Sequence, residues 1–368
     1  MEDKNIPLFK VHMPESAIEA AIATLRSGFV AGGAKAAKFE TEFGAFIGNK
    51  NVVATNCGSS ALLLALYLSG AKAGDEIICT PMTCNAVSES AYQTGAKIVW
   101  ADIAKATGNI SHSSIESKIT SKTKAILFSH WCGRLADIDA IKAIAKKHNL
   151  KVIEDAASAI GAIWQGQKIG NHFDYTAFSF QAVKQITTGD GGMLALKSEA
   201  EKERASLLCN HGNDRKAKRT PTSLGFDIFE VGWKYQMNDI AASIGLAQMP
   251  FLEEILAKSR RNAKLYDELL ANVPGLQILK EYPGAISSPW AYTVLVERRD
   301  DFVKKLQEHK IGCSVAHMRG DKLTVFKELA ADLPNLDYFY ERFINIPVGW
   351  WVSEEDVKAI CEIIKSGW

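Results

Sequence analysis

Short apolar runs rich in β-branched residues recur at regular intervals from about residue 50 to about residue 200. Most are bounded on both sides by polar turns, and they do not alternate strictly between apolar and polar positions. Such continuous runs are typical of strands that are buried on both faces of a sheet. The predicted strands are Val52–Thr55, Glu76–Thr80, Lys97–Ala101, Ala125–His130, Lys151–Glu154, Tyr175–Phe180 and Gly192–Leu196.

Helical patterns separate many of these runs. The repeated order of strand, helix and strand indicates an α/β fold with a mostly parallel sheet, covered on both faces and connected by right-handed crossovers. Ligands bind beyond the carboxyl ends of the strands in such sheets, so the residues that follow each strand are candidate site residues. The predicted helices are Ser60–Leu68, Asn85–Gln93, Ile138–Lys147 and Ala200–Leu208.

The pattern changes after about Asn238. A long helical pattern with alternating charges runs from Asp239 to about Asn272, and short strands mixed with helices follow it. We therefore predict a large domain of residues 1–240 and a smaller C-terminal α+β domain of residues 241–368, hinged by the long helix. In the smaller domain the predicted strands are Leu276–Leu279, Tyr292–Val296 and Cys313–His317, and the predicted helices are Asp301–His309 and Glu354–Lys365.

The composition narrows the class of protein. The 368 residues hold 43 Lys and Arg against 42 Asp and Glu, which gives no electrostatic signal for nucleic acid or an acidic membrane surface. No apolar run approaches the ~18–20 residues of a membrane-spanning helix, and the N-terminus lacks the pattern of a secretion signal. The seven cysteines have no C-x-x-C spacing. We therefore expect a cytoplasmic protein with reduced thiols and without a metal site.

Two groups of residues that follow predicted strands are candidates for ligand binding. Gly58-Ser59-Ser60 opens a helix, where free backbone N–H groups and hydroxyls suit a phosphate. In isolation the same motif also fits an ordinary serine cap. Asp155 follows Glu154 at the end of a buried strand and needs a cationic partner there. In isolation this pair of acids also fits a structural ion pair or a helix cap.

Lys184 is the third candidate. It follows an apolar aromatic strand and precedes the glycine-rich turn Thr187–Gly192, so we expect it to be partly desolvated, although a loop lysine is often only a surface residue. Desolvation lowers the pKa of an amine and makes it a nucleophile toward a carbonyl. A phosphate cradle, a carboxylate and a reactive lysine at one edge of a sheet are what pyridoxal phosphate (PLP) requires. We therefore predict PLP as the cofactor.

The chain resembles the DegT-type (DegT/StrS) sugar aminotransferases, which are PLP enzymes of the aspartate-aminotransferase fold, fold type I. The resemblance covers nearly the whole chain and implies a large domain with a mostly parallel sheet plus a smaller C-terminal domain. Its most specific motifs are Glu154-Asp155-x-Ala157 and Ser179-Phe180-x-x-x-Lys184. Further matching stretches are Ser27-Gly28-Phe29-Val30, Gly58-Ser59-Ser60-Ala61-Leu62, Asp75-Glu76-Ile77-Ile78, Lys122-Thr123-Lys124-Ala125-Ile126, His211-Gly212 and Met237-Asn238-Asp239.

The resemblance implies roles for the three groups. Lys184 would bind the cofactor covalently and then act as general base and acid in the proton shift of amine transfer. Asp155 would pair with the pyridine N–H, and Ser179 would hold the phosphate together with Gly58, Ser59 and Ser60. The family's sugar 3-dehydratases carry histidine at the position of Lys184, so amine transfer is favoured over dehydration.

Three residues depart from the family pattern. Cys84 follows Pro81-Met82-Thr83, where the family usually stacks an aromatic side chain on the cofactor ring. Ser158 stands where a Gln, His or Glu usually meets the phenolic oxygen of the cofactor. Lys234 stands where an Asn reaches the phosphate from the partner subunit, and a lysine there would supply a full charge. With these three changes we still expect PLP binding, and it is the identity of the substrate that they affect.

The resemblance also implies the reaction and its partners. The family moves an amino group, usually from L-glutamate, to a keto sugar on a nucleotide, often a 4-keto or 3-keto 6-deoxyhexose for surface polysaccharides or glycans. His317 and Arg319, just after a predicted strand, are candidate substrate contacts. We expect a homodimer in which Lys234 crosses between subunits. Two alternatives stay open: amination of a non-nucleotide sugar or cyclitol ketone, and a PLP-binding regulator without turnover.

Overall fold

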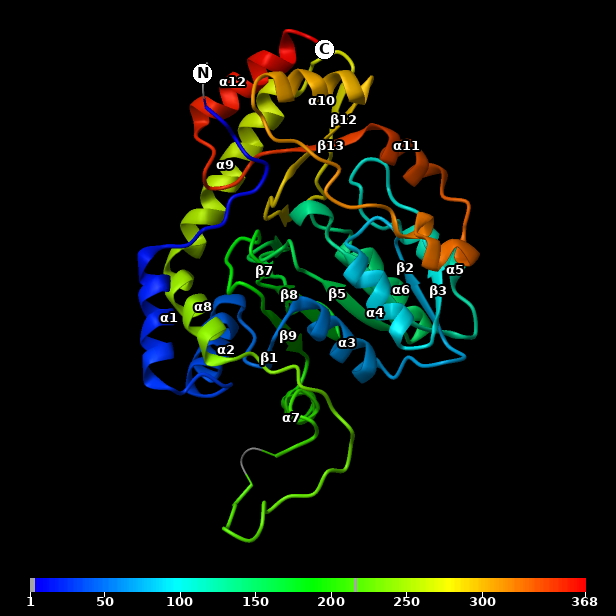
Figure 1. Ribbon diagram of the computed structural model, residues 1–368. Coiled ribbons are helices and arrows are strands. Elements are labelled where there is room, and N and C mark those ends of the chain that lie inside the picture. Colours follow the sequence, from blue (N-terminus) through cyan, green and yellow to red (C-terminus); the bar gives the residue numbers. More distant parts are fainter. Residues whose placement is uncertain (1–3, 215–216) are drawn as a thin grey trace.

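A seven-stranded sheet forms the centre of the computed structural model, which describes residues 4–214 and 217–368 (Figure 1). The strand order is β1-β9-β8-β5-β4-β2-β3. Strand β9 is antiparallel to both of its neighbours, and the other neighbouring strands are parallel. The predicted α/β fold with a mostly parallel sheet is therefore confirmed. The strands are β1 (Val52–Thr55), β2 (Glu76–Cys79), β3 (Lys97–Trp100), β4 (Thr123–Ser129), β5 (Lys151–Asp155), β8 (Tyr175–Ser179) and β9 (Gly192–Leu196).

Helices bury both faces of this sheet. Successive residues of a strand point to opposite faces, so Val53 joins one hydrophobic core while Val52 and Ala54 join the other. The first core includes α3 and α4, and the second includes α2 and α6. The helices around the sheet are α1 (Glu15–Ser27), α2 (Ala34–Ile47), α3 (Gly58–Ser69), α4 (Asn85–Gln93), α5 (His112–Lys118), α6 (Ile138–His148) and α7 (Glu199–Leu208).

A third hydrophobic core lies in the C-terminal part of the chain. Its antiparallel sheet has the order β10-β12-β13 and packs with α9, α10 and α12. The division between residues 240 and 241 stays a prediction. The elements are α9 (Leu252–Leu270), β10 (Leu276–Ile278), β12 (Tyr292–Val296), α10 (Arg299–Glu308), α11 (Pro334–Arg342), β13 (Phe343–Ile346) and α12 (Glu354–Lys365).

The predicted strand Cys313–His317 is wrong. This segment is irregular, with only Ser314 bridged to Asn345, and Ala316 has a left-handed backbone with φ of 55°. A left-handed residue interrupts an extended run, so the third strand of this sheet is β13 instead. A short sheet of two-residue strands, β11 (Ala285–Ile286), β6 (Ile163–Trp164) and β7 (Gln167–Lys168), was not predicted because such strands carry no pattern.

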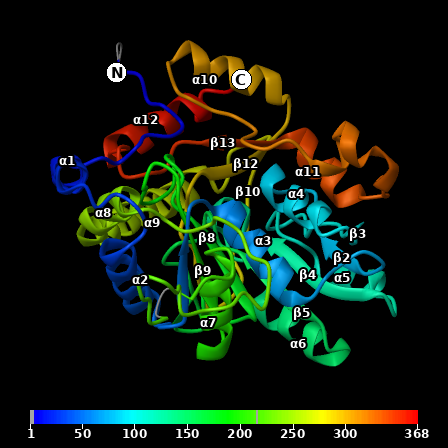
Figure 2. The ribbon, with the colours of Figure 1, turned by 60° about the horizontal axis from the view of Figure 1, so that its bottom comes forward.

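The predicted continuous helix from Asp239 is divided in the structure. Helix α8 (Asp239–Gln248) is followed by a 3-10 turn at Met249–Phe251 before α9 begins. Pro250 has no N–H to donate, which explains the change of geometry. Helix α8 packs against α1 and α2, whereas α9 packs against α12 (Figure 2).

By length and composition alone, Asp239–Leu270 is the one stretch within residues 4–214 and 217–368 that could cross a membrane. Of its most apolar window, 44% is buried inside the fold. All seven cysteines lie in the described residues and are free thiols.

The carboxylate of Asp239 holds the N-terminus of α2, more than 200 residues away in sequence. Gly33 precedes this helix and has no side chain to cap it. The N–H groups of Gly33 and Ala36 donate to Asp239 Oδ1 at 2.8 and 3.0 Å, and Lys35 N–H donates to Oδ2 at 3.2 Å. The side chain therefore replaces a local cap and ties α8 to α2.

We predict that Asp239→Ala lowers the free energy of unfolding by about 2 kcal/mol, because three N–H groups lose a charged acceptor. Urea unfolding followed by far-UV circular dichroism measures the change. The control is Asp139→Ala, which removes an exposed carboxylate from the first turn of α6. Equal stability of the two variants would contradict the assigned cap.

Candidate active site

The predicted site residues gather where β1, β5 and β8 end. Gly58 begins α3 just after β1, and Ser179 is the last residue of β8. A Cβ on residue 58 would lie 2.9 Å from the Cβ of Ser179, so only glycine allows this approach. Asp155 ends β5, which pairs in parallel with β8. Strands β1, β8 and β5 run in the same direction, with β9 between β1 and β8, so their carboxyl ends bring the three groups to one edge of the sheet.

The first turn of α3 offers N–H groups to an anion. The first N–H groups of a helix have no intrahelical acceptor, and the helix dipole favours negative charge beside them. Gly58 and Ser59 stand at this turn, and Gly58 lies next to the hydroxyl of Ser179. The hydroxyl of Ser60 instead donates to Asn56 Oδ1 at 2.7 Å, and its N–H donates to Cys57 Sγ at 3.4 Å. The side chain of Ser60 therefore stabilises the turn itself.

Asp155 is held by two hydrogen bonds. Its side chain is buried, with Oδ1 accepting the N–H of Ala157 at 3.0 Å and Oδ2 accepting the hydroxyl of Ser129 at 2.7 Å. The hydroxyls of Ser129 and Thr83 are also hydrogen-bonded, at 2.6 Å. These contacts fix the orientation of the carboxylate and link it to the loop that precedes Cys84.

The amine of Lys184 lies between a hydroxyl group and an aromatic ring. Nζ donates to Ser158 Oγ at 3.1 Å and lies 4.1 Å from the centre of the Trp290 ring. Burial lowers the pKa of this amine, and the negative charge of Asp155 opposes that effect. The structure thus places Ser158 and Asp155 beside the Lys184 amine, as the strand positions of Lys184 and Asp155 and the family resemblance of Ser158 predict.

Cys84 and Lys234, the other two residues that depart from the family pattern, are exposed to solvent. Cys84 is exposed at the start of α4 and close enough to Lys184 to act on the charge of its amine. Lys234 is exposed, and its amine donates to Gln236 Oε1 at 2.7 Å, while its carbonyl accepts Asn56 Nδ2 at 3.3 Å. Its backbone therefore lies near the phosphate turn of its own chain, and the crossing to a partner stays a prediction.

His317 and Arg319 have different environments. His317 stacks on Trp290 with ring centres 5.8 Å apart, and burial together with the charge of Lys184 lowers its pKa to about 4. Arg319 is buried, and its guanidinium donates to both carboxylate oxygens of Asp321 at 2.8 Å and to Asp337. His317 therefore lies beside the Lys184 amine, whereas the guanidinium of Arg319 is already occupied by two carboxylates.

Several side chains at the site were missed in the sequence. Trp290 stands just before β12, Ser129 ends β4, and Gln185 is adjacent to Lys184. Ser129 follows the same rule as Asp155, because it lies at the carboxyl end of a parallel strand, and that signal was available. Trp290 reaches the site from the C-terminal part of the chain, for which the strand rule gives no signal.

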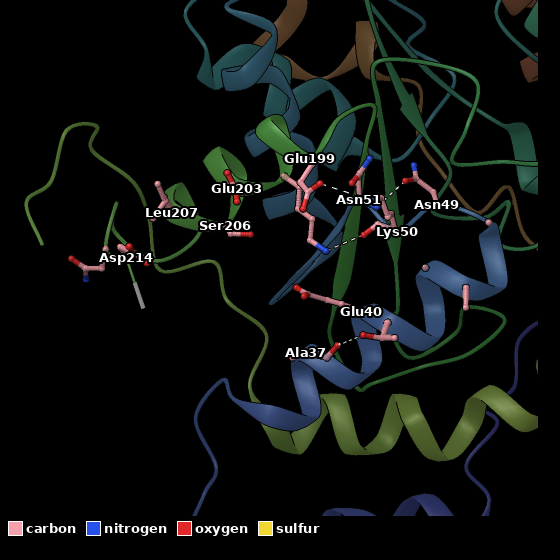
Figure 3. A pocket seen from close by; sticks show the side chains of 16 residues that line it. Ala37, Glu40, Asn49, Lys50, Asn51, Glu199, Glu203, Ser206, Leu207 and Asp214 are labelled. Carbon is pink, nitrogen blue, oxygen red and sulfur yellow. Dashed lines mark hydrogen bonds and ion pairs between the residues drawn. The ribbon is translucent and has the colours of Figure 1, made fainter. Parts of the chain in front are cut away.

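A cavity of about 1070 Å³ lies elsewhere, between α2 and α7 (Figure 3). Glu40 of α2 faces Glu199 and Glu203 of α7 across it. Lys50, which lines the cavity, precedes β1, whereas Gly58 of the candidate site follows β1. The cavity and the candidate site therefore lie at opposite ends of this strand. None of the predicted site residues lines it.

The donor set at the strand ends fits PLP. The N–H groups of the α3 turn and the hydroxyl of Ser179 suit a phosphate, and a glycine at position 58 lets a ligand approach the backbone. The oriented carboxylate of Asp155 suits a protonated ring nitrogen, and the partly buried amine of Lys184, whose pKa is lowered, suits an aldehyde.

Comparisons with known proteins agree with this fit. Residues 12–365 match the model of the DegT/DnrJ/EryC1/StrS aminotransferase family. GDP-perosamine synthase of Caulobacter vibrioides is 37% identical over 341 residues, covering 88% of this chain and 87% of that protein. The sugar aminotransferase CalS13 from Micromonospora echinospora has a TM-score of 0.95 at 33% identity, covering 99% of this chain and all of that one. The PLP form of a putative sugar aminotransferase from Streptococcus pneumoniae has a TM-score of 0.90 at 28% identity, covering 99% and 98%.

We predict that His317 is neutral at pH 7 and titrates near pH 4 in the folded chain. Nuclear magnetic resonance of histidine-labelled protein measures this value, with His317→Gln to assign the signal. Lys184→Ala should raise the pKa of His317, because a neighbouring positive charge is removed. Since unfolded histidine titrates near 6.5, this group makes the fold less stable as pH falls from 6.5 toward 4. Titration of His317 near 6.5 in the folded chain would contradict the buried site.

Proposed function

The chain belongs to the DegT/DnrJ/EryC1/StrS aminotransferase family, and from that premise we propose that it moves an amino group from L-glutamate to a nucleotide-linked keto sugar, with PLP as cofactor. One observation carries the proposal. A partly buried lysine amine, an oriented carboxylate and an open helix N-terminus meet at one edge of the sheet. The match to the family over residues 12–365 supports amine transfer as the reaction.

The substrate class rests on relatives of this chain. GDP-perosamine synthase, a UDP-amino-sugar transaminase and a spore coat polysaccharide biosynthesis protein are among the proteins it resembles. These names support a keto sugar on a nucleotide, used for a surface polysaccharide or another glycan. The same relationship supports a location in the cytoplasm, where nucleotide sugars are made.

PLP would supply an aldehyde that accepts the amine and a ring that takes up electrons during the transfer. Lys184 would hold the cofactor covalently and, once detached, take the proton from the carbon that bears the amino group. Its lowered pKa keeps a fraction of the amine neutral, which a base requires. Asp155, fixed by Ser129 and Ala157, would keep the proton on the ring nitrogen.

The remaining residues would bind and orient. Gly58, Ser59 and Ser179 would hold the phosphate, while Ser60 stabilises their turn through Asn56. Ser158 already accepts a hydrogen bond from the Lys184 amine. Cys84 would contact the ring from the exposed side.

His317 is the better candidate for a substrate contact. A neutral imidazole can donate and accept a hydrogen bond, and its ring lies beside Trp290 near the Lys184 amine. The guanidinium of Arg319 is already paired with Asp321 and Asp337, so we propose that it supports the loop that carries His317.

A homodimer is part of the proposal. Residues 217–231, which we call the arm, extend away from the body below α7 (Figure 1). Phe229 is 93% exposed and Val231 79% exposed. Large apolar side chains exposed together on an extended segment favour burial against another protein surface, here a second copy. Lys234 follows the arm, which agrees with a role across the interface.

We predict that the double variant Phe229→Asp, Val231→Asp shifts the protein from dimer to monomer and lowers transfer activity, because two charges would have to be buried in the interface. Sedimentation velocity measures the mass. Val325→Asp is the control, since it changes an exposed residue far along the chain in the C-terminal part. An active wild-type monomer would contradict the proposed dimer.

The function is tested with a panel of ketones and L-glutamate, with the amino product and 2-oxoglutarate followed by mass spectrometry. We predict turnover of nucleotide-linked keto sugars over free sugars and cyclitol ketones. Lys184→Ala should fold and lose at least about 100-fold in rate, because general acid–base catalysis is removed. Lys168→Ala is the matched control, since Lys168 also lies over an aromatic ring, that of Phe46.

Three outcomes of this panel would contradict the proposal. Preference for free ketones would overturn the nucleotide-linked substrate. Normal turnover by Lys184→Ala would overturn the mechanism. A bound cofactor without transfer to any ketone would favour a regulator.

A further inference from the structure

Trp290 contacts both the side chain and the backbone of the lysine segment. Its side chain is 7% exposed, and its ring centre lies 4.1 Å from Lys184 Nζ. Its indole N–H donates to the carbonyl of Val183, the residue before the lysine, at 2.7 Å. One side chain therefore covers the amine and fixes the adjacent peptide group.

The segment that carries Trp290 is itself held in place. The N–H of Trp290 donates to the carbonyl of Cys132 at 2.9 Å, and the N–H of Ser288 donates to that of Gly133 at 3.0 Å. A Cβ on residue 133 would lie 1.9 Å from the carbonyl oxygen of Ser288, so the two backbones are in direct contact. The indole is thus presented from a rigid support.

The residue after the lysine is tied to the same segment. Gln185 Nε2 donates to the carbonyl and to the hydroxyl of Ser288, at 3.3 and 3.2 Å, and to the carbonyl of Ser158 at 2.7 Å. Both neighbours of Lys184 are therefore bonded to residues 288–290. Such bonds restrict the lysine backbone to one conformation.

Two rings limit the motion of the indole. Phe9 stacks on it with ring centres 4.3 Å apart and planes at 21°, and His317 stacks at 5.8 Å and 10°. Phe9 comes from the N-terminal segment, which is anchored where Ile6 bonds to Lys310 and Gly312. The contacts that immobilise the ring thus come from both ends of the chain.

We propose that Trp290 is a positioning residue for the Lys184 amine: its ring keeps water from Nζ and its N–H fixes the lysine backbone, so that the detached amine points in one direction. This inference rests on the proposed function, in which Lys184 is the reacting amine.

Two effects of the ring act in opposite directions. An aromatic face attracts an ammonium group, whereas the exclusion of water disfavours it. Burial is the largest influence on Lys184, and its pKa is lowered overall. Removal of the ring should therefore admit water and raise the pKa of the amine toward its ordinary value.

The first test uses the chain without cofactor. Competitive acetylation of Lys184 at a series of pH values, measured by mass spectrometry, reports the fraction of neutral amine. We expect Trp290→Leu to shift the midpoint to higher pH, and Trp290→Phe, which keeps an aromatic cover, to stay near the wild type. Trp368→Leu is the control, because its N–H also donates to a carbonyl at 2.7 Å, that of Glu297, at the C-terminus.

The second test measures the reaction with L-glutamate. We expect Trp290→Leu to lower kcat by about 10-fold to 100-fold, since a displaced base reacts slowly, and to leave KM within about twofold. The pH profile of kcat should move in the same direction as the acetylation midpoint. Should the leucine variant not fold, Trp290→Met takes its place.

The outcomes separate this inference from the proposed function. An unchanged midpoint and an unchanged kcat in the leucine variant would overturn the role of Trp290, even when Lys184→Ala is inactive. A loss of activity with an unchanged midpoint and an equal loss in the phenylalanine variant would reduce Trp290 to a packing residue. Normal turnover by Lys184→Ala would overturn the proposed function itself.

Discussion

The partial burial of one lysine amine is the constraint on which the proposed site depends. A neutral amine is required for attack on a carbonyl and for proton transfer, yet an exposed lysine is almost fully charged at neutral pH. Burial lowers the pKa of Lys184, while the nearby charge of Asp155 opposes the change. The carboxylate cannot be removed, because it is the group suited to a protonated ring nitrogen. The effect of burial on the pKa of Lys184 outweighs this opposing charge.

The sheet and the C-terminal part of the chain satisfy this constraint jointly. Parallel strands bring Asp155 and Ser179 to the same edge, where α3 presents its first N–H groups. This arrangement alone would leave the amine open to solvent. Segment 288–290 closes that side with Trp290, and Phe9 packs behind the indole. The large sheet positions Lys184, and the C-terminal part of the chain covers the side of the amine that the sheet alone would leave exposed.

Elements that show a hydrophobic pattern within a few consecutive residues could be predicted from the sequence. The seven strands of the large sheet appear as apolar runs, and Lys184, Asp155 and Gly58 could be proposed as site residues because each follows a predicted strand. Strand β13 was missed because it follows α11 directly and carries the polar Asn345, which is buried against Thr293. Trp290 was missed because its partners, Val183, Phe9 and His317, are distant in sequence. The role of Arg319 as a substrate contact stays a prediction, and its pairing with Asp321, two residues away, has no signal in the strand pattern.

The central claim is that Lys184 binds the cofactor and that the bound cofactor accepts an amine. The most direct measurement is the visible absorbance of the purified protein with PLP, before and after addition of L-glutamate, in the wild type and in Lys184→Ala. We predict a yellow band in the wild type that bleaches with glutamate and is absent from the variant. The absence of a band in the wild type, or the same band and the same bleaching in Lys184→Ala, would contradict the account.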